Sequence, residues 1–155
     1  MDDHQDNAGI ITHPPVFYII AIILGLILDY IYPLSVGLAG NEKIAAIVLF
    51  ILGTIIIILG FRIFARNKQS PSVHASVTKV YQSGIYAYSR NPIYLGVALM
   101  MLAFGLYLDK LWIIFMMIPL IIILNRLVIE KEEAYLEAKF GEEYIKYKKK
   151  VRRWI

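Results

Sequence analysis

Two groups of polar residues lie beside apolar stretches of the sequence, and their types could support chemistry. In the first, Arg90 and Asn91 precede Pro92, where an apolar run begins. Asparagine is a preferred helix cap and proline suits the first helical position, so this tract predicts a capped helix N-terminus beside an arginine. Such a site can bind a carboxylate or a phosphate. The second group is the adjacent pair Glu132 and Glu133.

The two acids fall on the packed face of a helix predicted over residues 125–140. At about 100° per residue, the apolar stripe of this helix consists of Ile129, Leu136 and Phe140. The same face carries the polar residues Asn125, Arg126, Glu132 and Glu133. Two adjacent carboxylates there are costly unless a cation or a hydrogen-bond donor satisfies them. That partner is either an internal arginine, Arg90 or Arg126, or a ligand that carries positive charge or hydroxyl groups.

Other kinds of catalytic centre find no support in the sequence. There are no cysteines, which excludes disulfides and thiolate catalysis. His13 and His74 each lack a second histidine at ligand spacing, so we predict no metal site. The sequence contains no Ser-His-Asp order, Walker loop or G-x-G-x-x-G motif. Hydrolase, ATPase and soluble dinucleotide-binding functions are therefore not favoured.

The elements that must position these residues are predicted to be membrane-spanning helices. The chain has 155 residues, of which 59% are hydrophobic, a proportion too high for a soluble domain of this size. Four apolar runs are each close to the roughly 20 residues that cross about 30 Å of hydrocarbon: Pro15–Tyr32, Ile44–Ile63, Pro92–Leu108 and Leu111–Ile129. We therefore predict an all-α polytopic membrane protein of one domain, residues 1–155, with about four transmembrane helices and cytosolic C-terminal helices.

The distribution of positive charge predicts how these spans are oriented. Basic residues are concentrated between the second and third runs and, at nine positions, from Arg126 to Arg153. With four spans the N-terminus, the central loop and the C-terminus lie on one side, and the positive-inside rule makes that side cytoplasmic. The net charge of +4 therefore indicates contact with anionic lipid and no nucleic-acid partner. No G-x-x-x-G face is present, so the sequence leaves the oligomeric state open.

Single residues predict further details of these helices. Gly53 offers a close-packing point in the second span, and Asp29 takes an interfacial position near the outer end of the first. Pro119 should kink the fourth span, and Gly141 should end the helix that continues from it. A second short helix, Glu142–Trp154, should follow, with its lysines toward the lipid headgroups. The buried face of that helix consists of Tyr144, Tyr147 and Val151.

Two blocks of the sequence together resemble the integral-membrane methyltransferases, a group that includes isoprenylcysteine carboxyl methyltransferases and phospholipid N-methyltransferases. The first block extends from Val77 to Gly96 and the second from Glu132 to Trp154, in the order and spacing of that group. The resemblance implies a site for the cofactor S-adenosylmethionine on the cytosolic side, and a lipid or lipophilic methyl acceptor that enters from the bilayer. Residues 15–66 would then be scaffold spans, and residues 67–155 the cofactor and catalytic half.

The resemblance also implies roles for individual residues. The implied cofactor-binding set is Tyr86, Asn91, Pro92, Tyr94, Gly96, Glu132 and Glu133. The implied catalytic set is Arg90, Arg126 and Glu133. The two arginines would hold the anionic group of the acceptor or the carboxylate of the cofactor. The implied reaction transfers a methyl group from S-adenosylmethionine to an isoprenylcysteine-type carboxylate or to a phospholipid amine.

One residue departs from the pattern of the isoprenylcysteine enzymes. Those enzymes usually have histidine where this chain has Asn91, and asparagine cannot exchange a proton, so a histidine-dependent step at this position is excluded. Asparagine is found there in phospholipid-type and bacterial relatives, which implies a prokaryotic inner-membrane protein. The alternative is a non-catalytic membrane scaffold or small transporter subunit, in which Arg90, Glu132 and Glu133 form a structural ion-pair cluster.

Overall fold

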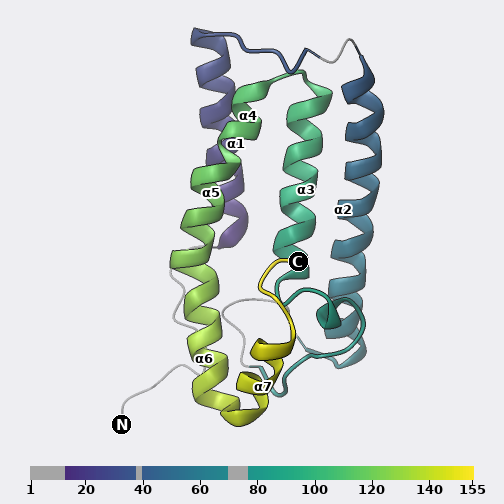
Figure 1. The fold of residues 1–155 in the computed structure, drawn as a ribbon, viewed down its shortest axis with the longest axis vertical. Helices are drawn as coiled ribbons and strands as arrows, with labels where there is room; N and C mark the ends of the chain where they lie inside the picture. Colours follow the sequence, from purple (N-terminus) through teal and green to yellow (C-terminus); the bar gives the residue numbers. More distant parts are fainter. Residues whose placement is uncertain (1–12, 38–39, 70–76) are drawn as a thin grey trace.

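The computed structural model describes residues 13–37, 40–69 and 77–155, and every regular element in these ranges is helical (Figure 1). The elements in chain order are α1 (Pro14–Ile31), α2 (Asn41–Arg66), the 3₁₀ turn η1 (Gly84–Ala87), α3 (Pro92–Tyr107), α4 (Leu111–Phe115), α5 (Met117–Leu124), the π-helix η2 (Asn125–Ile129), α6 (Glu130–Phe140) and α7 (Glu142–Lys150). The predicted all-helical fold is therefore confirmed for the described ranges.

Three helices are long and apolar enough to cross a membrane. They are Pro14–Ile31, Glu42–Arg66 and the 30-residue helix Leu111–Phe140, which combines α4, α5, η2 and α6. The shorter helix α3 has 16 residues. At about 1.5 Å per residue it is about 24 Å long, which is less than the roughly 30 Å of hydrocarbon. Three spans are therefore supported, and the predicted number of four is not confirmed.

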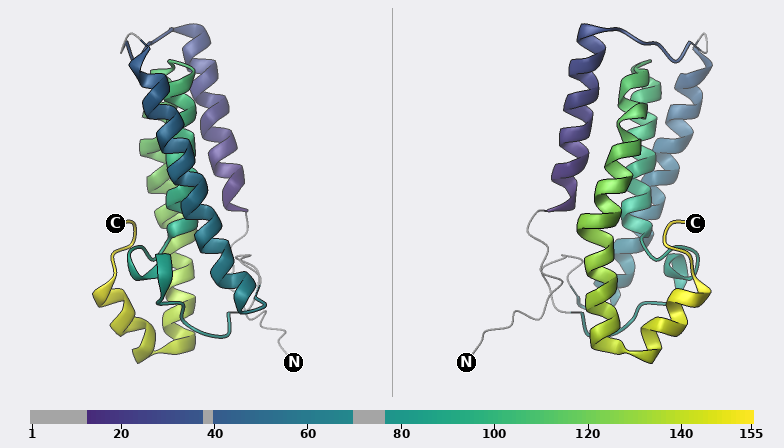
Figure 2. Two further views of the ribbon diagram at one scale, coloured as in Figure 1. Left: turned by 90° about the vertical axis from the view of Figure 1, so that its right-hand side faces the viewer. Right: turned by 60° about the vertical axis from the view of Figure 1, so that its left-hand side comes forward.

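The polar elements gather at one end of the helical bundle. Figures 1 and 2 show that α1 and α3 begin, and α2 ends, at the end where η1, α6 and α7 lie. The turn between α3 and α4 lies at the opposite end, beside the residues that follow α1. Both polar groups singled out in the sequence are consequently carried to one boundary of the bundle.

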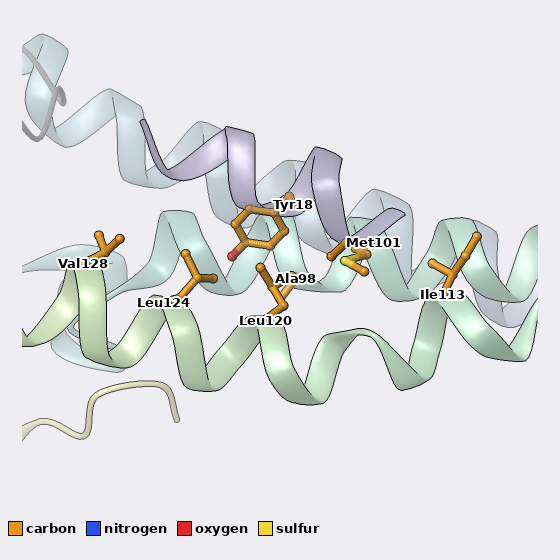
Figure 3. Close-up of a cluster of buried hydrophobic side chains, with 8 residues drawn as sticks. Tyr18, Ala98, Met101, Ile113, Leu120, Leu124 and Val128 are labelled. Carbon is orange, nitrogen blue, oxygen red and sulfur yellow. The ribbon is translucent and has the colours of Figure 1, made fainter. Parts of the chain in front are cut away.

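A hydrophobic core joins α1 and α3 to the long helix that begins with α4. Its buried members include Tyr18, Ala98, Met101, Ile113, Leu120, Leu124 and Val128 (Figure 3). At Gly25, an added Cβ would lie 2.9 Å from the Ile113 Cα, so the absence of a side chain lets α1 approach α4 closely. This core fixes the position of α1 relative to the start of α3, where the polar groups lie.

A second close contact joins α2 to α3 through two glycines. A Cβ added to Gly53 would lie 2.6 Å from the Gly96 carbonyl oxygen, and one added to Gly96 would lie 2.6 Å from Ile57 Cγ1. Both distances are too short for real atoms, so the pair of glycines is needed for this helix spacing. The close packing predicted at Gly53 is confirmed.

The last apolar helix is irregular at two places. It is interrupted at Met116, between α4 and α5, three residues before Pro119. Proline lacks the amide hydrogen that would bond the carbonyl of Phe115, so the interruption near Pro119 follows from its chemistry and agrees with the predicted kink. The second irregularity is the π-helix η2, which the sequence did not indicate. It lies directly before the two glutamates.

At the end away from the polar groups, Asp29 forms a salt bridge with Lys110. Asp29 also accepts a hydrogen bond from the amide of Leu34 at 3.3 Å. Nearby, Asp109 accepts one from the amide of Val36 at 2.7 Å. Asp29 thus lies in the last turn of α1, near the end of that helix as predicted, where it is buried and paired with a cation.

At the polar end, Gly141 separates α6 from α7. Its φ of 52° and ψ of −127° favour glycine, and they turn the chain sharply after α6, as the sequence predicted. The helix that follows ends at Lys150, four residues before the predicted end at Trp154. Val151 is extended, and residues 151–155 form a tail that bonds to other parts of the site. The predicted buried face of Tyr144, Tyr147 and Val151 is confirmed.

Candidate functional site

Glu133, on α6, lies at the centre of a cluster of cations. Arg90 Nη2 lies 2.9 Å from Glu133 Oε1. The Arg153 guanidinium makes two contacts, Nη2 to Oε2 at 2.8 Å and Nε to Oε1 at 3.1 Å. Lys148 Nζ is 3.6 Å from Oε2. The side chain of Glu133 is only 5% exposed, so its charge is compensated inside the protein and not by water.

Glu132 lies in a different environment from its neighbour. Its Oε1 accepts a hydrogen bond from the Tyr94 hydroxyl at 2.8 Å. Among the residues that the structure describes, no cation lies within salt-bridge distance of Glu132. A partly buried carboxylate without a counter-charge is unfavourable, and this makes Glu132 the acid with unused capacity for a cation. The structure therefore separates two acids that the sequence treats alike.

The C-terminal tail completes the wall beside Glu133. The Arg90 amide donates to the Arg152 carbonyl at 3.1 Å, and Asn91 Nδ2 donates to the Arg153 carbonyl at 3.0 Å. On the other side, Trp154 Nε1 donates to Asn125 Oδ1 at 3.1 Å. The tail thus lies between the start of α3 and the π-helix η2, and it brings the Arg153 side chain to Glu133. This hydrogen bond to Glu133 raises the pKa of Arg153.

The tract before α3 occupies the predicted place, with one correction. Pro92 is the first residue of α3 and is fully buried. Asn91 is in the N-cap position, but its side chain makes no capping hydrogen bond. Its Nδ2 group instead donates to the tail, while its backbone amide donates to Ser89 Oγ at 3.1 Å. The side chain of Asn91 therefore holds the C-terminal tail and does not cap the helix.

Arg126 is not brought to the acid pair. Its side chain is 72% exposed and pairs with Glu130 one turn later, at 3.1 Å. The prediction placed Arg126 on the face of Glu133 because it assumed a regular α-helix. The π-helix η2 contains more residues per turn, so the faces before and after it are rotated relative to each other. Asn125 remains inside through its bond to Trp154.

Tyr86 and Gly96 have positions that serve packing. Tyr86 is buried in η1, with its ring centroid 6.0 Å from that of Phe64. Its carbonyl accepts a hydrogen bond from the Tyr147 hydroxyl at 2.7 Å. Burial raises the pKa of the Tyr86 phenol, and the nearby Tyr147 and Glu132 add to the rise. Gly96 faces α2, where its neighbours are Gly53 and Ile57.

Two cations of the cluster were not predicted from the sequence. Lys148 was expected to face lipid headgroups with the other lysines of α7, but it forms salt bridges with Glu133 and Glu137. Arg153 was expected inside a helix and lies in the tail. One signal could have found Lys148, since it follows Tyr147 and lies four residues after Tyr144 on the buried side of α7. No sequence signal gives the path of the tail.

An apolar groove of about 760 Å³ extends from this site along the helices. Its lining comes from α1, α2 and α3, with His13 at the start of α1. Tyr94 joins the two regions, because it lines the groove while its hydroxyl binds Glu132. The Tyr18 hydroxyl donates to the Tyr94 carbonyl at 2.9 Å and holds α1 against this point. A volume of this size falls within the range of small-molecule sites.

The described ranges contain no group of three or more His, Asp or Glu side chains that could hold a metal ion. His74, considered in the sequence, lies outside these ranges.

Comparison with known proteins agrees with this arrangement. A sequence profile of the family described as phospholipid methyltransferase matches residues 41–143, about two-thirds of the chain. An uncharacterised protein of Haemophilus influenzae (strain Rd) is 44% identical over 63 residues, which are 41% of this chain and the full length of that protein. No solved structure matches the chain. The profile covers Arg90, Tyr94 and both glutamates, and the chain therefore belongs to the phospholipid methyltransferase family.

Proposed function

We propose that the protein transfers a methyl group from S-adenosylmethionine to a lipid acceptor at one boundary of the membrane. Membership of the phospholipid methyltransferase family supports a membrane methyltransferase. The observation that carries the proposal further is Glu132, a partly buried carboxylate without a cation partner in the described part of the chain. It lies where an apolar groove meets a polar cluster. A cationic cofactor and a lipophilic acceptor require this combination.

The unused hydrogen-bonding groups of the site fit the cofactor. S-adenosylmethionine carries a positive sulfonium, an amino group and a carboxylate. Glu132 offers an uncompensated negative charge for a cation. Arg90 offers a donor, since its Nε atom is buried and has no hydrogen-bond partner among the described residues. A buried donor without a partner is rare in folded proteins and calls for an explanation, of which a bound group is one. We therefore propose that Glu132 and Arg90 hold the cofactor.

When bound, S-adenosylmethionine supplies a methyl group made electrophilic by the positive charge on sulfur. Glu132 would stabilise that positive charge, and the Tyr94 hydroxyl would keep the carboxylate oriented toward it. Glu133 would act indirectly by holding Arg90 and Arg153 in place. The groove residues would exclude water and align the acceptor, and such positioning can supply several kcal/mol of the barrier.

The groove supports a lipid as the acceptor. Its lining is almost entirely apolar, and it runs along helices whose outer faces are aliphatic, for example at Ile23 and Ile58. A hydrocarbon chain in the groove would place its headgroup near Tyr94 and Glu132. The family description favours a phospholipid over a prenylated carboxylate. We propose that the groove holds part of the lipid chain during transfer.

The test measures cofactor affinity by calorimetry in detergent, with both S-adenosylmethionine and S-adenosylhomocysteine, whose sulfur is a neutral thioether. We expect Glu132→Gln to weaken binding of the charged cofactor by about tenfold or more, because a hydrogen bond or ion pair to a charged group contributes about 1.5–3 kcal/mol. The ratio between the two affinities should also fall. Glu142→Gln, an exposed glutamate with the same change of charge, is the matched control.

If the protein is instead a non-catalytic membrane scaffold, the cofactor should not bind. The three cations around Glu133 are compatible with a purely structural cluster. A scaffold requires that folded wild-type protein bind neither compound at millimolar concentration. That outcome would refute the proposed function, and an unchanged affinity ratio in Glu132→Gln would refute the role given to Glu132.

A further inference from the structure

We propose that Trp154 and Asn125 are positioning residues of the cofactor site, because their hydrogen bond ties the C-terminal tail to the π-helix η2 and keeps the two walls of the site together. The inference rests on the proposed function and adds to it a coupling between the tail and the affinity for the cofactor. The site residues inferred from the sequence include neither of the two. Trp154 also lies outside residues 41–143, which the family profile matches.

The first wall is the start of α3, to which the tail is attached through its backbone. The Arg90 amide donates to the Arg152 carbonyl at 3.1 Å, and Asn91 Nδ2 donates to the Arg153 carbonyl at 3.0 Å. Both acceptors are carbonyl oxygens of the tail, so these bonds depend on the path of the tail. This wall carries Arg90 and, one turn later, Tyr94, which orients Glu132.

The second wall is η2 with the helix α6 that follows it. Trp154 Nε1 donates to the Oδ1 atom of Asn125 at 3.1 Å, and Asn125 is the first residue of η2. The Trp154 side chain is half-buried and packs against the hydrophobic core of Figure 3, against which Tyr94 also packs. Arg152 and Ile155, in the same tail, are exposed. Trp154 is thus the residue that attaches the tail to the second wall.

The polar atoms of this pair have a use that packing alone does not explain. Asparagine is disfavoured inside helices because its side chain competes for backbone hydrogen bonds. An indole N–H group needs an acceptor when it is buried. Phenylalanine and leucine would fill the same positions without either requirement. The hydrogen bond between Trp154 and Asn125 therefore serves to specify where the tail and η2 meet.

The meeting point matters because η2 sets the direction of the acid pair. Each residue of an α-helix turns the chain by about 100°, so relaxation of the π-helix to regular geometry would rotate α6 relative to the helix before it. Glu132 would then lose the Tyr94 hydroxyl, now at 2.8 Å. A displaced tail would also withdraw Arg153 from Glu133. The Trp154–Asn125 bond opposes both changes.

The first experiment measures cofactor affinity by calorimetry on detergent-purified protein that circular dichroism shows to be folded. We expect Trp154→Phe to weaken binding of S-adenosylmethionine and S-adenosylhomocysteine by about threefold to tenfold, the factor that corresponds to one net hydrogen bond. Trp112→Phe is the matched control, since it removes an indole bond of 2.7 Å to the Tyr32 carbonyl at the opposite end of the bundle (Figure 1). Its affinities should equal those of the wild type.

A double-mutant cycle tests whether the two residues act through one another. Asn125→Leu removes the acceptor and should weaken binding by about the same factor as Trp154→Phe. The double variant should bind no more weakly than either single variant, because both changes remove the same interaction. Residues with separate effects would instead multiply their two factors.

A second experiment uses the wild-type protein and observes the hydrogen bond itself. The chain has two tryptophans, so labelling with nitrogen-15 tryptophan gives two indole N–H signals in an NMR spectrum. The signal absent from Trp112→Phe belongs to Trp112, and the other belongs to Trp154. Coupling between two sites is reciprocal, so saturating S-adenosylhomocysteine should slow hydrogen exchange of the Trp154 indole by about the factor lost in Trp154→Phe. Exchange at Trp112 should not change.

Three results would overturn the inference. They are wild-type affinity in folded Trp154→Phe or Asn125→Leu, multiplied effects in the double variant, and an exchange rate of the Trp154 indole that S-adenosylhomocysteine leaves unchanged. In each case normal binding by wild-type protein would leave the proposed function intact. Failure of cofactor binding by folded wild-type protein would overturn both.

Discussion

Replacing Glu133 by glutamine removes an anion that Arg90, Lys148 and Arg153 share. Glutamine has nearly the same volume and keeps one carbonyl oxygen, so the change is mainly electrostatic. The Glu133 and Arg90 side chains are 5% and 8% exposed, and water compensates little of the charge that remains. Breaking a buried pair by removing one partner costs about 3–5 kcal/mol. We expect Glu133→Gln to lower the free energy of unfolding by about 3 kcal/mol.

The greater exposure of Arg153 predicts a smaller effect when that cation is replaced. Arg153 is 29% exposed and loses its bonds to Glu133 in Arg153→Met, but Arg90 still pairs with the acid. We expect a smaller loss of about 1–2 kcal/mol, after allowing for solvent. Glu142→Gln, on the exposed side of α7, should remain within about 0.5 kcal/mol of the wild type.

The assay follows helix content by circular dichroism during unfolding in mixed detergent micelles, and cofactor binding by calorimetry on the folded protein. If Glu133→Gln unfolds within about 1 kcal/mol of the wild type and loses cofactor binding, then Glu133 is a direct ligand and the reasoning from the cation cluster is refuted. The sequence alone favoured that direct role. The observed contacts favour a positioning role.

Two further substitutions test neighbouring parts of the site. Tyr94→Phe removes the only hydrogen bond that the described structure gives Glu132, 2.8 Å long, and calorimetry should show about tenfold weaker binding of S-adenosylmethionine; unchanged affinity would mean that Glu132 needs no orientation. Gly96→Ala brings a Cβ to 2.6 Å from Ile57 Cγ1, and overpacking of this kind should lower the free energy of unfolding by about 1–3 kcal/mol. The folded fraction of that variant should still bind the cofactor. If folded Gly96→Ala protein does not bind it, Gly96 belongs to the cofactor site after all.

Local chemistry explains the features of the fold that the sequence predicted correctly. Runs of apolar residues indicated helices for lipid surroundings because no other element satisfies its own backbone there. Gly141 ends α6 because its backbone conformation favours glycine, and the interruption near Pro119 follows from a missing amide hydrogen. The predicted number of four spans is not confirmed because α3, with 16 residues, is shorter than the thickness of the hydrocarbon region. The predicted end of α7 was wrong because tertiary hydrogen bonds hold the C-terminal tail in an extended conformation.

The candidate site was predicted in part. Arg90, Tyr94 and both glutamates are brought together, as the two sequence blocks suggested. Arg126 was wrongly predicted to face the acid pair, because the regular α-helical period assumed for this segment does not hold across a π-helix. Arg153 could not be found because the path of an extended tail depends on partners that are distant in sequence. Asn91 has the backbone position of an N-cap, but its side chain donates a hydrogen bond to the C-terminal tail and does not cap the helix.

The sequence by itself predicted a helical membrane protein that resembles the integral-membrane methyltransferases, with an arginine tract and an acid pair at one boundary. Composition suffices for the helices because lipid permits few structures, and the resemblance could be found because the two blocks that carry it are local in sequence. The tertiary structure decided which of the two acids is left without a cation partner among the described residues. Glu132 and Glu133 are adjacent and chemically identical, so no local pattern could distinguish them. Only the arrival of Arg90, Lys148 and Arg153 from other elements neutralises Glu133 and leaves Glu132 facing the groove through Tyr94.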